Sequence, residues 1–215
     1  MATEFNVDVE IPFNFEIIVQ DADSTIDNSS TDELYDQLYS GVFLNGKRKK
    51  FWVDKKSGGN SFMLFAKDMS IIWSDDSSYW QWISVKETSD VTVDAAELLD
   101  VCWLEIRARI DTTKLSPGIP YEAAFVAMMK DHSYGWENPV KLGLLLPNGS
   151  KKEHQRDLRE IKQRNQWTEI PVGEFITFVL RKEGSWKSLC VEARVCIGRK
   201  DLSSKVLSFA QRINN

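Results

Sequence analysis

Apolar and polar residues alternate in two long stretches of the chain, residues 101–111 and 189–197. Successive side chains of a β-strand point to opposite faces, so each stretch predicts a strand with one face in a core. The expected core positions are Leu104, Ile106, Ala108 and Ile110 in the first strand and Leu189, Val191, Ala193, Val195 and Ile197 in the second. On the second strand the outward positions are Cys190, Glu192, Arg194 and Cys196.

Shorter apolar runs recur between turn signals such as Asn45-Gly46, which is typical of a hairpin. This pattern of many short strands predicts an all-β fold: an antiparallel β-sandwich, jelly-roll-like, with short peripheral helices. One short helix is expected at residues 31–38, with Thr31 as its N-cap. The densely charged segment 151–164 could form a solvated helix or a long mobile loop, and the loop is favoured.

The chain divides into three parts by composition. Residues 1–30 end in an acidic, serine-rich run and predict a flexible N-terminal extension. Residues 31–200 hold the strand-like segments and predict one domain, which is long enough to form a core without disulfides. Residues 201–215 read as a weakly helical, peripheral C-terminal tail.

The overall charge argues against a general affinity for nucleic acid. The formal net charge is −5 and the pI is about 5.2. The basic residues Lys47, Arg48, Lys49 and Lys50 leave two readings open, a nucleic-acid contact or a solvated hairpin tip, and the second is favoured. No run of about 20 apolar residues is present, which predicts no membrane span. The acidic N-terminus is unlike a secretory signal peptide, so a cytoplasmic protein is expected.

Catalytic and metal-binding signals are weak. His132 and His154 have no Cys or His at ligand spacing, and no nucleophile or phosphate-loop motif is present. The acid pairs Asp75/Asp76 and Glu169/Glu174 could suggest a glycosidase, but acids are common in this chain. We therefore expect a protein that is not an enzyme and that needs no cofactor or metal.

The three cysteines, Cys102, Cys190 and Cys196, do not suggest a disulfide framework. Cys190 and Cys196 lie six residues apart on one predicted strand, so roughly 20 Å separates their Cα atoms and they cannot bridge each other. Both point outward, so either could bond another chain if it is exposed. The simpler expectation is that they are structural thiols in a reducing compartment.

The densest aromatic cluster lies in residues 62–82, where Trp73, Trp80 and Trp82 surround a polar turn. Tryptophan is too large to bury easily, and its N–H needs a hydrogen-bond acceptor. Flat indoles next to Asp, Ser and Gln side chains are suited to sugar rings or nucleobases. On pattern alone, a binding face and a core are equally good interpretations of this cluster.

Separate stretches also resemble one known family, in order along the chain. They are MLFAKDMSIIW (63–73), YWQW (79–82), VCWLEI (101–106), YEAAFV (121–126) and WTEIPVGEF (167–175). They resemble the phloem protein 2 family, the plant lectin family that includes the tobacco agglutinin, and residues 41–54 resemble its longer phloem-type members. Lys67 and Met69 depart mildly from the family pattern, and no F-box-like segment precedes the matched region.

The resemblance implies a β-sandwich lectin that binds N-acetylglucosamine oligomers, such as chitin fragments or the core of N-glycans, with a phloem or defence role. It also implies a homodimer located in the cytoplasm, the sieve-tube sap or the nucleus. Trp73 and Trp80 match the family's sugar-binding tryptophans, and Trp167, Glu169 and Glu174 extend the expected site. Trp82 is expected in the core.

Two other functions stay open. The first is a structural role in cross-linked phloem filaments, with Cys190 or Cys196 forming disulfides between chains. The second is weak RNA binding through Lys47–Lys50 and residues 151–164. No membrane partner is expected.

Overall fold

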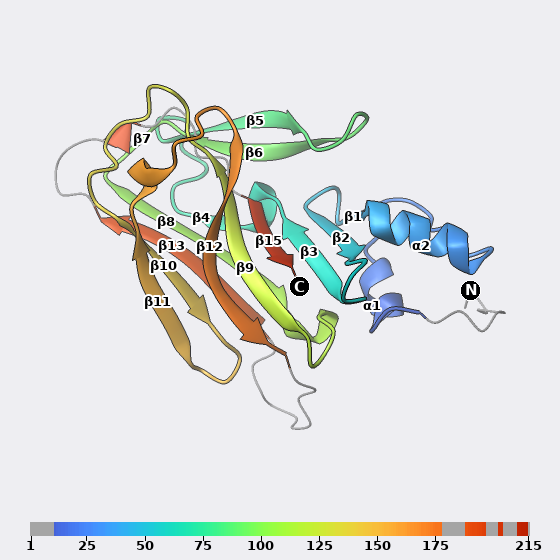
Figure 1. Cartoon of the computed structure of the whole chain (residues 1–215). Helices are drawn as coiled ribbons and strands as arrows, with labels where there is room; N and C mark the ends of the chain where they lie inside the picture. The colour runs from blue at the N-terminus through green and yellow to red at the C-terminus, as the bar shows by residue number, and fades with distance from the viewer. Residues whose placement is uncertain (1–10, 178–187, 197–201, 204–209, 215) are drawn as a thin grey trace.

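The chain forms a sandwich of two antiparallel β-sheets, as the sequence predicts. The structure is a computed structural model that describes residues 11–177, 188–196, 202–203 and 210–214, with only the backbone described for residues 195–196, 202–203 and 210–214. Figure 1 shows the two sheets packed face to face, with the short helices at one side. Among the described residues, no helix is long and apolar enough to span a bilayer.

The first sheet has six strands in the order β1-β2-β3-β15-β9-β12. Their bounds are β1 Val42–Leu44, β2 Lys49–Val53, β3 Asn60–Leu64, β15 Ala210–Asn214, β9 Pro120–Met128 and β12 Trp167–Ile176. The helices α1 (Phe15–Val19) and α2 (Thr31–Ser40) lie beside β1 to β3 (Figure 1).

The second sheet has five strands in the order β11-β10-β13-β8-β4. Their bounds are β11 Lys151–Arg156, β10 Val140–Leu145, β13 Ser188–Cys196, β8 Trp103–Asp111 and β4 Ser70–Ile71. Two further antiparallel pairs are β5 (Trp80–Lys86) with β6 (Thr92–Leu98), and β7 (Asp100–Val101) with β14 (Leu202–Ser203). Short 3-10 helices span Ala66–Asp68, Thr112–Lys114 and Leu158–Glu160.

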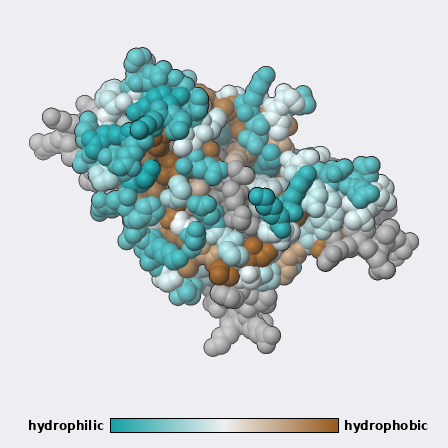
Figure 2. Space-filling model, in the orientation of Figure 1, coloured by the Kyte–Doolittle hydropathy of each residue, from teal (hydrophilic) through white to brown (hydrophobic). Residues whose placement is uncertain are grey.

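The core lies between the two sheets. The alternation of apolar and polar residues in β8 and β13 predicts which of their side chains face it. Every expected core residue of β8 is buried, and so are the described ones of β13; they are Leu104, Ile106, Ala108, Ile110, Leu189, Val191 and Ala193. The side chain of Val195 and the residue Ile197 lie outside the described part of the chain. Figure 2 shows that hydrophilic residues cover most of the visible outer face, with apolar residues in narrow patches between them. The hairpin expected at Asn45-Gly46 joins β1 to β2.

The described part of the N-terminal segment, residues 11–30, differs from the prediction of a flexible extension, and residues 1–10 lie outside the described residues. Residues 11–30 pack onto the domain, because Phe15 and Ile18 are buried in the core. The Asn60 side-chain amide also donates to the backbone oxygens of Phe13 at 2.7 Å and Lys114 at 2.9 Å. The helix α2 is capped by Ser30, whose hydroxyl accepts from the Glu33 N–H at 3.2 Å, one residue before the expected cap.

Residues 210–214 of the expected C-terminal tail are not a peripheral helix, because they form β15, which lies between β3 and β9 inside the six-stranded sheet. Residues 201, 204–209 and 215 of that tail lie outside the described residues. The expected loop at 151–164 is also wrong in its first half. Residues 151–156 form the edge strand β11, paired with β10 along its whole length. All six of its side chains are exposed, so the strand shows no alternation of buried and exposed positions. It is defined by its backbone pairing alone.

Candidate functional site

The loop between β4 and β5 carries the exposed tryptophan of the aromatic cluster. Trp73 is 43% exposed, and its backbone is left-handed, with φ at 56°. A bulky residue in this region is strained, and such strain persists only where the surroundings impose it. The backbone N–H of Ile72 donates to the Glu105 oxygen of β8 at 3.0 Å, which anchors the loop to the sheet.

Two neighbouring indoles hold the residues on either side of Trp73. The Nε1–H of Trp80 donates to the Ile72 oxygen at 3.0 Å, and that of Trp82 donates to the Ser74 oxygen at 3.2 Å. Both donors come from β5, where residues two apart point to the same side. The pair therefore fixes the backbone that presents the Trp73 ring.

Trp80 is a core residue, which corrects its predicted role as a sugar contact. It is 2% exposed and belongs to the main hydrophobic cluster, so its ring has no free face. Trp82, expected in the core, is half-buried, packs against that cluster, and carries the Lys67 ammonium 3.6 Å from its ring centroid. Among the three clustered tryptophans, only Trp73 offers an open indole.

Tyr79 is the site residue that the sequence did not single out. Its ring centroid lies 5.3 Å from that of Trp73 with the planes at 39°, which is a favourable geometry for an aromatic pair. Between them, Asp75, Asp76 and the serines Ser77 and Ser78 are exposed. An apolar platform edged by carboxylates and hydroxyls can bind a polyhydroxylated ring. The signal in the sequence that could have identified Tyr79 is its position directly after the polar turn that begins after Trp73.

Trp167 and Glu169 share a second location, at the start of β12. Both are exposed, Trp167 by 40%. They line a cavity of about 390 Å³ between the outer face of the six-stranded sheet and the β5–β6 hairpin, together with Met63, Phe65 and Val93 among others. Among the described residues that line it, neither Trp73 nor Glu174 occurs.

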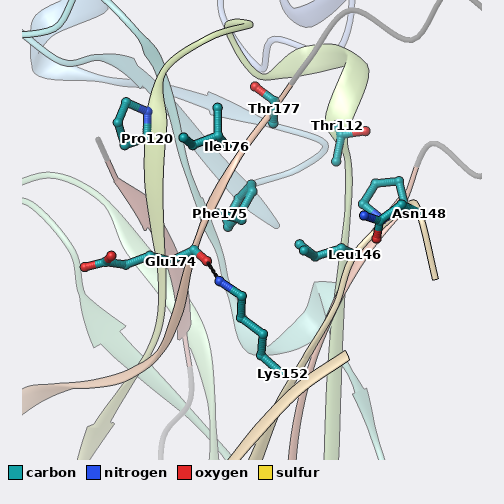
Figure 3. Close-up of a pocket in the computed structure, with 10 residues that line it drawn as sticks. Thr112, Pro120, Leu146, Asn148, Lys152, Glu174, Phe175, Ile176 and Thr177 are labelled. Atoms are coloured by element: carbon teal, nitrogen blue, oxygen red, sulfur yellow. Dashed lines mark hydrogen bonds between the residues drawn. The ribbon is translucent and has the colours of Figure 1, made fainter. Parts of the chain in front are cut away.

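Glu174 lies at the far end of the same strand. A β-bulge between Pro171 and Gly173 shifts the register with β9, so Glu174 and Glu169 are both exposed although they are five residues apart. Glu174 lines a different cavity of about 500 Å³. In Figure 3 its carboxylate points away from Lys152, whose ammonium donates to the Glu174 backbone oxygen at 2.7 Å.

The basic segments are partly neutralised by neighbouring carboxylates. Lys49 pairs with Asp68 at 3.3 Å, and Lys50 pairs with Glu87 at 3.1 Å. In the second segment the ion pairs are Lys151–Glu153, Arg156–Glu160 and Arg159–Asp157. Phosphate contacts need cations that are free of such partners, so neither segment forms a purely basic patch.

Cys190 is placed as a structural thiol, which is the simpler of the two expectations for it. Cys190 faces outward from β13 but is only 7% exposed, since it is flanked by Arg109 of β8 and Leu145 of β10. Cys102 is the exposed free thiol of the described residues, and the side chain of Cys196 lies outside them. No group of three or more His, Cys, Asp or Glu side chains is placed to hold a metal ion within the described part of the chain.

Comparisons with solved structures find only distant likeness. The xylan-binding CBM22-1 domain of Xyn10C from Paenibacillus barcinonensis is 9% identical, with a TM-score of 0.37 over 70% of this chain and 86% of that domain. A module in complex with β-1,4-galactotriose, TmCBM61, is 11% identical, with a TM-score of 0.29 over 72% of this chain and 88% of that one. Likeness at this level does not bear on ligand or mechanism.

Sequence relatives are much closer. Protein PHLOEM PROTEIN 2-LIKE A1 of Arabidopsis thaliana is 47% identical over 171 residues, covering 78% of this chain and 68% of that protein. A protein named Lectin from Luffa acutangula is 43% identical over 169 residues, covering 78% of this chain and 80% of its own length. The family model described as Phloem protein 2 matches residues 59–205. With most of its length matched in this way, the chain belongs to the phloem protein 2 family.

Proposed function

We propose that this protein is a non-catalytic lectin that binds oligomers of N-acetylglucosamine, with Trp73 as its stacking surface. The observation that carries the proposal is the geometry of Trp73. Its indole is exposed on a left-handed backbone, and two tryptophan N–H groups hold the carbonyls before and after it. Core packing gives no reason to hold an exposed indole on a strained backbone with two hydrogen bonds. A preorganised binding surface does give such a reason.

The chemistry of the ligand matches the surroundings of this indole. An acetamido sugar has an apolar ring face and an acetyl methyl group that can pack on the Trp73–Tyr79 pair. Its hydroxyls and amide can bond to the exposed carboxylates of Asp75 and Asp76. Each such contact is weak on its own, so we expect oligomers to bind more tightly than single sugars.

Trp167, Glu169 and Glu174 enter the proposal as additional contacts. The cavity beside the β5–β6 hairpin combines an exposed indole with a carboxylate, which is the same pairing of apolar and acceptor groups as at Trp73. The relatives support a sugar ligand, since one of them is named a lectin. A homodimer in the cytoplasm or nucleus of phloem cells would add avidity through two sites.

Of the two other functions, cross-linking has a specific observation in its favour. The thiol of Cys102 is exposed, so a disulfide between chains would form there and not at the buried Cys190. RNA binding is less well supported, because carboxylates pair with cations in both basic segments.

The test is retention on chitin. Trp73→Ala should remove retention while near-ultraviolet circular dichroism remains that of a folded protein. Tyr134→Ala is the matched control, because Tyr134 is another exposed aromatic side chain on a loop and should leave retention intact. Full retention by folded Trp73→Ala would remove Trp73 from the site.

A further inference from the structure

The outer face of the five-stranded sheet has a trough that is separate from the cavities of Trp167 and Glu174. It has a volume of about 470 Å³ and is lined by residues of β8, β10, β11 and β13 and by the segment before β10. Strand pairing fixes its layout: Glu153 of β11, Gly143 of β10 and Glu192 of β13 form one row across the sheet.

Gly143 forms the floor of the trough. Its φ is not in the left-handed region, and a Cβ built there would meet only the Glu153 and Lys151 side chains, at 3.6 Å. Neither backbone conformation nor a clash therefore requires glycine at this position. What glycine provides in the middle of this sheet is room for the Lys151 side chain, whose ammonium lies 2.7 Å from the Glu153 carboxylate and 3.9 Å from that of Glu192.

The charges that line the trough balance. Lys141 and Arg194 stand against Glu153 and Glu192. The carboxylates are held in position, since Glu192 accepts from Arg194 at 3.1 Å and Glu153 pairs with Lys151 at 2.7 Å. The hydrogen bond from Lys151 lowers the pKa of Glu153, so this carboxylate stays ionised and able to accept.

Several hydrogen-bonding groups in the trough have no protein partner. Within the described part of the chain, the side chains of Asn138, Lys141 and Gln155 form no hydrogen bond or ion pair, although all three line the trough. These groups can bond to a ligand without breaking an internal contact.

A half-buried indole, Trp103, supplies the apolar surface at the β8 side. Two residues further along β8, the backbone oxygen of Glu105 accepts a hydrogen bond from the backbone N–H of Ile72, the residue before Trp73. Trp73 thus follows the edge strand β4 of the sheet that carries the trough. From β4 to β11 the sheet spans roughly 19 Å at about 4.8 Å per strand, a width that an oligomer can cover and a single sugar cannot.

We propose that this trough is a binding subsite for a neutral oligosaccharide, which continues into it from Trp73 across the five-stranded sheet. Balanced charges, free amides and one indole suit a polyhydroxylated chain without net charge. A phosphate-rich ligand such as RNA would meet Glu153 and Glu192. The proposal rests on the proposed lectin function, because it takes Trp73 as the other end of the site.

Chain-length dependence tests this proposal. Gly143→Val fills the floor, and Leu145→Val is the matched control, because Leu145 is exposed on the same strand but does not line the trough. Calorimetric titration with chitobiose and chitohexaose gives both affinities. We expect Gly143→Val to weaken chitohexaose binding roughly tenfold, the loss of one or two net hydrogen bonds, and to leave chitobiose binding unchanged. The control should match wild type with both probes.

The outcomes separate this subsite from the lectin site itself. Unchanged chitohexaose affinity in folded Gly143→Val would overturn the subsite while leaving Trp73 intact. Equal loss of both probes would also overturn it, since the short probe should not reach the trough. Absence of binding by the wild type, or full binding by Trp73→Ala, would instead count against the lectin site. Lys141→Met is a second variant that should reproduce the selective loss, because it removes the unpaired donor.

Discussion

The indole N–H of Trp80 donates a 3.0 Å hydrogen bond to the backbone oxygen of Ile72, so a buried tryptophan positions an exposed one. Trp80 thereby supports the proposed binding surface at Trp73, although its own ring is buried. Its neighbour Trp82 acts in the same way on Ser74. The strained backbone of Trp73 between these two carbonyls is the expected consequence of such bracing.

The first prediction concerns this bond. Trp80→Phe keeps an aromatic ring in the core but removes the donor, so we expect a loss of about 1–2 kcal/mol in the free energy of unfolding. Retention on chitin should weaken as well, because the Trp73 loop loses one of its two braces. Urea denaturation and chitin retention measure the two effects.

Trp136→Phe is the control for that substitution. Trp136 is buried like Trp80, but its Nε1–H has no hydrogen-bond partner among the described residues. The change of ring size is identical in the two variants, so their difference isolates the hydrogen bond. Equal effects of the two variants on retention would show that Trp80 contributes packing alone.

The second prediction concerns the attachment of the N-terminal segment. Asn60 is fully buried, and its amide bonds the Phe13 and Lys114 oxygens. Asn60→Ala leaves both acceptors unpaired, which should cost about 2–3 kcal/mol of unfolding free energy. It should also expose residues 11–30 to limited proteolysis, because one of their ties to the sheet is lost.

The adjacent Ser61 offers a close comparison. Its hydroxyl is buried and has no partner within the described residues, so Ser61→Ala should change stability by far less. Cleavage within residues 11–30 should stay at the wild-type rate. If the two variants were equally destabilised, the Asn60 bonds would not be what holds the segment.

The alternating strands were predictable because their pattern is local. β8 and β13 show their buried face in the alternation of their residues, and the described side chains on that face are buried as predicted. β11 has no apolar side of its own, and β15 is defined by pairing with β3 and β9, which are far away in sequence. Nothing local to either segment could show that it is a strand.

The site was predictable only in part, for a related reason. Aromatic density and the family resemblance identified the loop that carries Trp73. The roles of Trp80 and Trp82 were not readable, since residues two apart on a strand share a face whether that face is buried or open. The left-handed backbone of Trp73 leaves no trace in residue types either, because it is imposed by hydrogen bonds from β5.

The third prediction is a dependence of stability on pH. Burial raises the pKa of Asp68 above its usual range, and Lys49 at 3.3 Å offsets this only partly. The folded state therefore binds a proton more readily than the unfolded state, and this contribution to stability falls as pH rises above about 3.9. Asp68→Asn cannot ionise, so its stability relative to wild type should increase with pH across this window in urea denaturation.

Asp157 provides the opposite sign. Hydrogen bonds from Arg159 lower its pKa, so its carboxylate contributes stability that is lost as pH falls through its folded pKa. Relative to wild type, Asp157→Asn should therefore become less stable as pH rises through the region below about 3.9. The effect should be small because this pair is exposed to solvent. The same slope for both variants would contradict the burial of Asp68 as the cause.

The fourth prediction concerns the thiols and bears on the cross-linking function. Cys102 is exposed and Cys190 is buried, so a maleimide should label Cys102 in the native protein and Cys190 only after unfolding. The labelling is read by mass spectrometry in a Cys196→Ser variant, in which Cys102 and Cys190 are the two remaining cysteines. Under mild oxidant this background should give a disulfide-linked dimer on a non-reducing gel, and the further change Cys102→Ser should abolish it. A dimer that persists without Cys102 would require Cys190 to become accessible in the folded chain, which its cover by the neighbouring strands opposes.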